Sequence, residues 1–129
     1  MNGLHLIADL HGCRCPPHLL LDAVGLQSLC VDACQRHGLT VVGQLFHPFV
    51  DAAGRAAGVT GTVVLAESHL AIHTWPEISA VTLDVYVCNF SGDNSSRAHA
   101  LFNEVIAAFA PTHLEKKEVA RGHLQLDAH

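Results

Sequence analysis

The run from Val81 to Cys88 constrains the fold most, because apolar side chains alternate in it with polar side chains and a thiol. A period of two is the pattern of a β-strand with one buried face. The segment therefore predicts a sheet that is covered on one face and carries polar groups on the other. The apolar set is Val81, Leu83, Val85 and Val87, and the other set is Thr82, Asp84, Tyr86 and Cys88.

Further strands are predicted where β-branched and apolar residues gather between turn residues. They are Leu4–Leu10, Thr40–Phe46 (continuing towards Phe49), Thr62–Leu65, Leu70–Thr74 and, near the C-terminus, His113–Arg121. Residues 50–61 contain three glycines and are predicted to form a loop. After Gly122 we expect the chain to fray.

Two segments have helical spacing. One opens at Pro16-Pro17 and carries an apolar stripe as far as His37, with Gly38 as the residue that ends it. The second runs from Ala98 to Phe109, after a loop at 89–95 that can cap it. The order β-α-β-β-β-β-α-β predicts an α+β two-layer sandwich, a largely antiparallel sheet with helices on one face, and a single domain over residues 1–129.

Composition excludes several classes of function. Half of the 129 residues are hydrophobic and 15% are charged, which is typical of a packed globular protein. The formal charge of -5 and the absence of a basic cluster argue against a nucleic-acid partner. No stretch is long and apolar enough to suggest a membrane partner. Five cysteines without a disulfide pattern and no signal-like start favour a reduced, cytoplasmic protein.

The stretch from Ala66 to Glu77 carries the functional signal. It contains a Glu67-Ser68 bond, two histidines four residues apart, the only tryptophan and a Pro-Glu turn. An apolar core does not require this mixture. Because Glu67-Ser68 lies between two predicted strands, we expect it at a strand end or a tight bend.

Here the chain resembles the short prokaryotic pyruvoyl-dependent S-adenosylmethionine decarboxylases. The motifs that carry the resemblance are Gly58-Val59-Thr60-Gly61, Glu67-Ser68-His69-Leu70, Ile72-His73-Thr74-Trp75-Pro76-Glu77 and Asp84-Val85-Tyr86-Val87-Cys88. The resemblance implies the fold of that family. It also implies a homodimer in which two sheets pack face to face, giving four layers (α/β/β/α) with two active sites at the interface.

The resemblance implies that the proenzyme cuts itself between Glu67 and Ser68, giving chains 1–67 and 68–129. The Ser68 hydroxyl attacks the preceding carbonyl, the amide becomes an ester, and elimination and hydrolysis leave a pyruvoyl group in place of Ser68. That cofactor forms a Schiff base with the substrate amine and accepts the electrons released by loss of CO2. The expected product is decarboxylated S-adenosylmethionine, the aminopropyl donor of polyamine and spermidine biosynthesis.

The same resemblance assigns the site residues. Thr60 and His73 would assist self-cleavage, and Cys88 would be the general acid that protonates the decarboxylated carbon. Phe49 would stack on the adenine, Glu77 would accept hydrogen bonds from the ribose, and Leu70 would also bind substrate. Without the resemblance, Cys88 would be interpreted as a small buried hydrophobic residue.

Several positions depart from the family pattern. Thr60 replaces the usual serine, and the segment 50–57 is longer than usual. Residues 78–81 replace Tyr-Gly-Tyr-Ala, and Asn89-Phe90 replaces a glycine-acidic pair. A relative that had moved to L-arginine or L-ornithine would keep the Glu-Ser, His and Cys set while its pocket changed, so a basic amino acid is the alternative substrate.

Two non-enzymatic hypotheses compete. A metal-binding module could use Cys13, Cys15, Cys30 and Cys34, but the last two lie on the apolar stripe of their own helix, and no metal site is expected. An inactive regulatory paralogue would be free to lose Ser68, His73 and Cys88, and all three are present.

Overall fold

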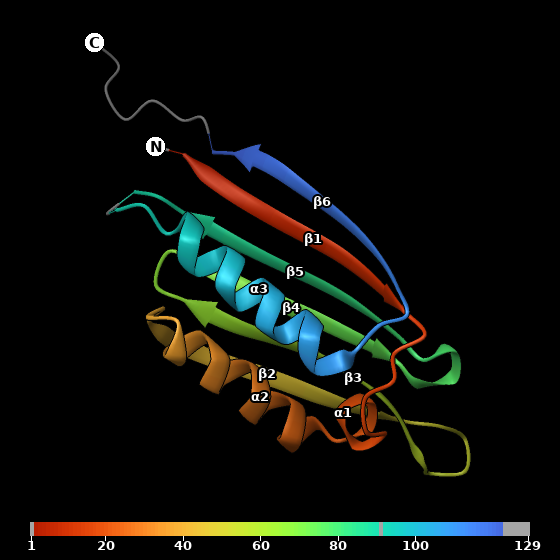
Figure 1. Ribbon diagram of the computed structural model, residues 1–129. Coiled ribbons are helices and arrows are strands. Elements are labelled where there is room, and N and C mark those ends of the chain that lie inside the picture. The colour runs from red at the N-terminus through yellow and green to blue at the C-terminus, as the bar shows by residue number, and fades with distance from the viewer. Residues whose placement is uncertain (1, 91, 123–129) are drawn as a thin grey trace.

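A computed structural model describes residues 2–90 and 92–122. Six antiparallel strands form one sheet in the order β2-β3-β4-β5-β1-β6 (Figure 1). Their bounds are β1 Gly3–His11, β2 Val41–Val50, β3 Ala56–Leu65, β4 Ser68–Trp75, β5 Ala80–Cys88 and β6 His113–Arg121. The structure confirms the predicted α+β class. The residues predicted to fray, 123–129, lie outside the described part of the chain.

The helices α1 (His18–Leu21), α2 (Ala23–Arg36) and α3 (Ser95–Phe109) all lie on the same face of this sheet (Figure 1). We call this the helix face and the opposite one the open face. The core fills the space between the helices and the helix face. The six inward side chains of α3 that build its share of the core all lie within the predicted helical segment and are Ala98, Leu101, Phe102, Val105, Ile106 and Phe109.

Strand β5 confirms the alternation predicted from the sequence. Val81, Val85 and Val87 are completely buried, and Leu83 is nearly so. Thr82, Asp84 and Tyr86 are partly exposed on the open face. The pairing of β5 with both β4 and β1 places these polar side chains in the middle of the sheet.

The prediction of one helix from Pro16 to His37 was wrong. Asp22 has an extended backbone (φ -101°, ψ 107°) and separates α1 from α2. Its carboxylate accepts a hydrogen bond from Val24 N at 3.1 Å, so it caps α2 in place of continuing the first helix. The predicted end was correct, since Gly38 follows α2 with a φ of 78°.

The predicted loop over 50–61 was also wrong in its second half, because β3 begins at Ala56. Two of its glycines serve close packing within the sheet. A Cβ on Gly61 would lie 2.2 Å from the Phe46 ring, and one on Gly58 would lie 2.9 Å from the carbonyl oxygen of Thr74. These two positions are glycine because the sheet leaves no room for a side chain there, and not because the chain turns.

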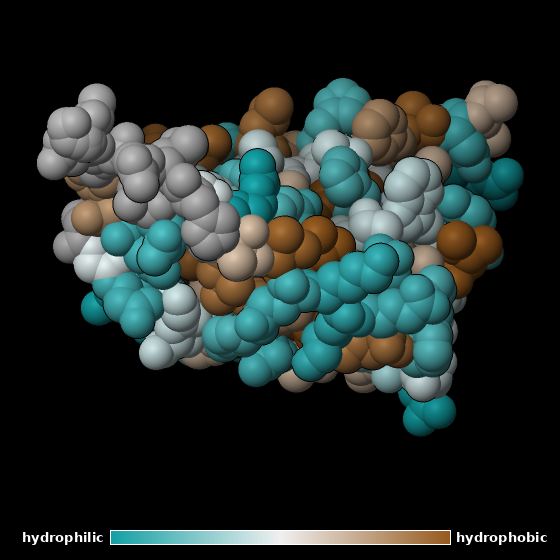
Figure 2. Space-filling view, turned by 90° about the horizontal axis from the view of Figure 1, so that it is seen from above, coloured by the Kyte–Doolittle hydropathy of each residue, from teal (hydrophilic) through white to brown (hydrophobic). Residues whose placement is uncertain are grey.

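Charged residues line the β6 edge of the sheet, where Glu115, Lys116, Lys117 and Glu118 are exposed. Figure 2, seen from above, shows hydrophilic residues in a band on this side of the molecule. Charges of this kind discourage pairing with another strand. Among the described residues, no helix is long and apolar enough to cross a membrane.

Candidate active site

The Glu67-Ser68 bond lies at the tip of the β3–β4 hairpin. Leu65 pairs with Ser68, so only Ala66 and Glu67 form the loop. Favoured two-residue hairpin turns need a positive φ, and neither loop residue has one. The loop is held by a residue outside the hairpin, because Ala66 N donates to the carbonyl oxygen of Thr40 at 3.0 Å. The prediction of a tight bend at the Glu-Ser bond is confirmed.

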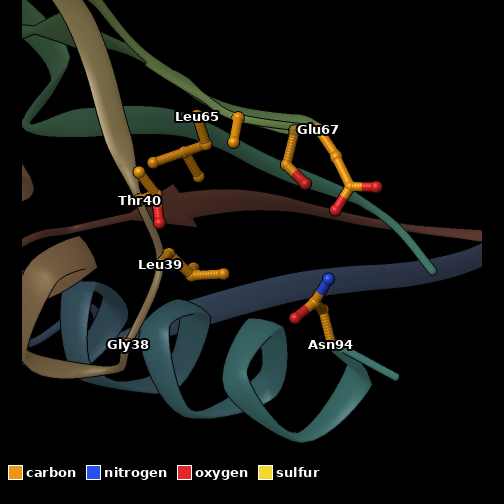
Figure 3. Close-up of a pocket in the computed structure, with 8 residues that line it drawn as sticks. Gly38, Leu39, Thr40, Leu65, Glu67 and Asn94 are labelled. Carbon is orange, nitrogen blue, oxygen red and sulfur yellow. The ribbon is translucent and has the colours of Figure 1, made fainter. Parts of the chain in front are cut away.

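Ser68 lies on the helix face, because it shares its side of β4 with buried Leu70 and Ile72. Its hydroxyl accepts a hydrogen bond from the backbone N–H of Cys88 at 3.3 Å. A cavity of about 140 Å³ opens beside it, bounded by residues 38–40, the hairpin tip and Asn94 (Figure 3). Ser68, the predicted nucleophile of self-cleavage, therefore has an oriented oxygen and space next to it.

Cys88 contacts Ser68 through its own backbone N–H. It ends β5, pairs with Gly3 of β1, and only 7% of its surface is exposed. The alternation of β5 puts its side chain on the same face as Asp84 and Tyr86. Ser68 and Cys88 are thus neighbours at one end of the sheet through the Cys88 backbone, with their side chains on opposite faces.

Thr60 and His73 form a second group on the open face. They are direct partners in the β3–β4 ladder, and Thr60 Oγ1 lies 3.1 Å from His73 Nδ1. The two side chains share a hydrogen bond, in which the imidazole tautomer decides which atom donates. The structure thus places these two predicted residues side by side.

This pair does not meet Ser68 within one chain. His73 follows Ser68 by five residues on the same strand, which is about 16 Å at roughly 3.3 Å per residue. An odd separation also places the two side chains on opposite faces of the sheet. The predicted site therefore divides into Ser68 with Cys88 at one end and Thr60 with His73 further along the open face.

The predicted substrate residues have different outcomes. Phe49 is 47% exposed on the open face of β2, opposite Gly58. Glu77 is exposed in the short 3₁₀ helix η1 (Pro76–Ile78) that follows β4. The Leu70 side chain is completely buried in the core beneath the helices, which leaves only its backbone for contact with a substrate. A substrate on the surface cannot contact that side chain.

Sequence reasoning missed a cluster on the open face beside this site. His5 Nε2 and His69 Nε2 lie 2.9 and 3.3 Å from the same oxygen of Asp84. Arg121 donates to His5 Nδ1 at 3.1 Å and stacks over Tyr86. The residues come from four strands, so only the strand register could have revealed the cluster.

These contacts define the protonation pattern of His5. Because Arg121 can only donate, His5 Nδ1 accepts, and the proton of the neutral ring lies on Nε2, facing Asp84. A metal on Nε2 would need the proton on Nδ1, against the guanidinium. We therefore interpret this cluster as a hydrogen-bond network, although His5, His69 and Asp84 have the spacing of metal ligands.

The four cysteines of the metal hypothesis do not form a ligand set. Cys30 and Cys34 lie in the core with no exposed surface, and burial raises the pKa of both thiols, that of Cys34 to about 12. Burial raises the pKa of the half-buried Cys13 to about 11. Thiolates are the form that binds zinc, and these environments disfavour them. In the described ranges, the three-residue group with ligand spacing contains no cysteine.

Comparison with known proteins identifies the family. The sequence profile of S-adenosylmethionine decarboxylase matches residues 4–122. The S-adenosylmethionine decarboxylase proenzyme of Hydrogenobaculum sp. (strain Y04AAS1) is 37% identical over 123 residues, covering 95% of this chain and 84% of the relative. The proenzyme of Picrophilus torridus is 36% identical over 120 residues, covering 93% and 84%.

A solved structure agrees with these sequence matches. The crystal structure of the adenosylmethionine decarboxylase from Aquifex aeolicus superposes with a TM-score of 0.81 at 31% identity. The superposition covers 98% of this chain and 96% of that one. The chain belongs to the S-adenosylmethionine decarboxylase family.

Proposed function

We propose that the protein is a self-cleaving, pyruvoyl-dependent decarboxylase that converts S-adenosylmethionine to its decarboxylated form and CO2. The observation that carries the proposal is the placement of Glu67-Ser68 in a two-residue hairpin loop, with the Ser68 hydroxyl held by Cys88 N–H. An isolated Glu-Ser pair in a surface loop would need no such contact. The family comparisons favour S-adenosylmethionine over L-arginine or L-ornithine as substrate.

The residues present fit a pyruvoyl group derived from Ser68. The N–H of Cys88 occupies one lone pair of the Ser68 oxygen and so limits the orientation of this hydroxyl beside the Glu67-Ser68 peptide bond. The cavity beside the hairpin leaves room for the tip to separate after cleavage. Once formed, the group would serve as the electron sink for decarboxylation.

Thr60 and His73 fit the task of moving protons during self-cleavage. Serine is a weak nucleophile and needs a base within hydrogen-bond reach. An imidazole held by a hydroxyl at 3.1 Å has a defined ring orientation for that role. Threonine retains the oxygen that the family's usual serine provides.

A homodimer explains why the site divides into two groups. The open face carries apolar side chains that the helices do not cover, namely Leu45, Phe49, Val64 and Trp75, each 44% exposed or more. Packing two open faces against each other would bury them. It would also bring Thr60 and His73 of one protomer close to the hairpin tip that carries Ser68 of the other. We therefore propose two composite active sites per dimer.

Phe49 and Glu77 fit substrate binding in the same arrangement. Phe49 lies opposite Gly58 of β3, and Trp75, a second exposed aromatic residue, lies two residues beyond His73 on β4. Aromatic faces attract both a flat purine and a sulfonium cation. The Glu77 carboxylate, on η1 immediately after Trp75, is available to accept from ribose hydroxyls.

Release of labelled CO2 tests the substrate assignment. The purified protein is incubated separately with carboxyl-labelled S-adenosylmethionine, L-arginine and L-ornithine, with the Ser68→Ala variant as control. We expect release from S-adenosylmethionine by the wild type only. Release from arginine or ornithine alone would overturn the substrate, and equal release by Ser68→Ala would overturn the cofactor. A cytoplasmic location stays a prediction.

A further inference from the structure

Asn94 contacts the Cys88 end of the site, although sequence reasoning gave it no role. Its Nδ2 donates to the carbonyl oxygen of Cys88 at 3.1 Å, and its Oδ1 accepts from Arg97 Nη1 at 2.9 Å. One partner requires a donor and the other an acceptor, so the amide has one orientation. Figure 3 shows this amide facing the Glu67 hairpin across the cavity beside Ser68.

The side chain of Asn94 does not cap α3, although its position at the helix N-terminus suggests that it would. Asn94 is the N-cap residue of α3, where an asparagine oxygen ordinarily accepts from a helix N–H. No such bond is made here. Asp93 instead accepts from Ser95 N at 2.9 Å, so the Asn94 amide is directed at Cys88.

A second asparagine supports this orientation. Asn89 Oδ1 accepts from Asn94 N at 2.9 Å, and Asn89 Nδ2 donates to Ser95 Oγ at 3.3 Å. These hydrogen bonds join Asn89, at the start of the loop between β5 and α3, to Asn94 and Ser95 at the start of the helix. Asn89 occupies a position where the sequence departs from the family pattern.

The result is a Cys88 residue that is held on both sides. Its N–H donates to Ser68 Oγ, and its C=O accepts from Asn94 Nδ2. A shift of this backbone would move the donor that orients Ser68 and also the Cys88 thiol. Both proposed reactions, self-cleavage and protonation of the product, depend on that geometry.

We propose that Asn94 is a positioning residue that holds the Cys88 backbone for self-cleavage and for proton donation, an inference that rests on the proposed function. It acts through Cys88 and does not touch the reacting atoms. A replacement that removes the donor without disfavouring the start of α3 should therefore impair the site without unfolding the protein.

Asn94→Asp meets that requirement. Aspartate is as good an N-cap as asparagine, and its charge suits a helix N-terminus. It still offers an oxygen to Arg97, but it places a carboxylate against the Cys88 carbonyl. The matched control is Asn103→Asp, an exposed asparagine on α3 away from the hairpin.

Two readouts are compared among wild type, Asn94→Asp and Asn103→Asp. The first is the rate of chain cutting, followed by intact mass. We expect Asn94→Asp to be slower by about tenfold, the scale of one lost orienting hydrogen bond. The second is iodoacetamide labelling of each cysteine over a pH series. We expect faster labelling of Cys88 alone, with Cys30 and Cys34 still protected.

The labelling result decides the proposal. Unchanged labelling of Cys88 in Asn94→Asp would overturn it, and so would parallel labelling of Cys30 and Cys34, which would indicate general loosening. If the wild type does not cut itself at all, the proposed function fails. The Cys88 labelling comparison then still supports or rejects the role of Asn94.

Discussion

Thr60 Oγ1 and His73 Nδ1 lie 3.1 Å apart on the open face, whereas Ser68 occupies the far end of the same strand and points to the helix face. The residues that we propose for one reaction are thus held at two places in one chain. The Thr60–His73 pair is built into the β3–β4 ladder and cannot slide towards Ser68 without breaking the register. In the homodimer that we propose, a second copy of the chain brings the two groups together.

Mixing two inactive variants tests the composite site. Ser68→Ala and His73→Ala should each remain uncut alone. When they are co-expressed, a mixed dimer contains one site with Ser68 from one protomer and His73 from the other. We predict that the His73→Ala chain is then cut, as gel electrophoresis of tagged chains would show.

The same experiment has a clear contrary result. If Ser68 and His73 act within one protomer, no chain in the mixture carries both residues and nothing is cut. A mixture of two differently tagged Ser68→Ala chains controls for cutting by contaminating proteases.

Replacing the hydroxyl next to His73 should slow self-cleavage. Thr60→Val keeps the shape and removes the oxygen, and we expect roughly a fivefold to tenfold slower rate for loss of this hydrogen bond. Thr60→Ser should retain cutting near the wild-type rate. Intact mass over time measures both, and a Thr60→Val protein that cuts normally would remove Thr60 from the proposed site.

Cys88→Ala should separate the two reactions. The backbone N–H that orients Ser68 is unchanged, so we expect the chain to cut itself. Loss of the general acid should lower decarboxylation by about a hundredfold or more. Cys13→Ala, in a different part of the fold, is the control. Full decarboxylation by Cys88→Ala would contradict its role as proton donor.

The ion pair between α2 and α3 predicts a pH effect on stability. Arg36, and to a lesser extent His37, hold the pKa of Glu104 below its ordinary value. A lowered native pKa stabilises the fold above the unfolded pKa of about 4.3, and this contribution is lost as pH falls through the native value.

Glu104→Gln should therefore be less stable than wild type at pH 7, by up to about 1 kcal/mol because the pair is partly exposed. The difference should shrink when urea unfolding is repeated at progressively lower pH below about 4. Glu118→Gln, on β6, is a control with a more exposed carboxylate. A Glu104 difference that grows in acid would contradict the assignment.

Sequence periodicity predicted the elements whose burial depends on local spacing. The α3 stripe and the alternation of β5 are of this kind, and both have the predicted faces. Errors occurred where a residue serves a distant partner. Gly58 and Gly61 indicated a loop because the Phe46 ring and the Thr74 carbonyl that require them are not visible in the sequence.

The site shows the same limit. The resemblance supplied Ser68, Thr60, His73 and Cys88, and the ladder register explains why Thr60 meets His73. The resemblance did not reveal that the Leu70 side chain points into the core. Nor did it reveal that the Asn94 side chain donates to the Cys88 carbonyl in place of capping the helix. Such contacts depend on strand register and loop geometry, which no local pattern encodes.

Intact-mass spectrometry of the purified protein, incubated with S-adenosylmethionine and then reduced with cyanoborohydride, tests the central claim most directly. We predict two chains divided between Glu67 and Ser68, with the substrate attached only to the second chain and only after reduction. A single uncut chain of 13.8 kDa without an adduct would contradict the account and favour an inactive regulatory paralogue.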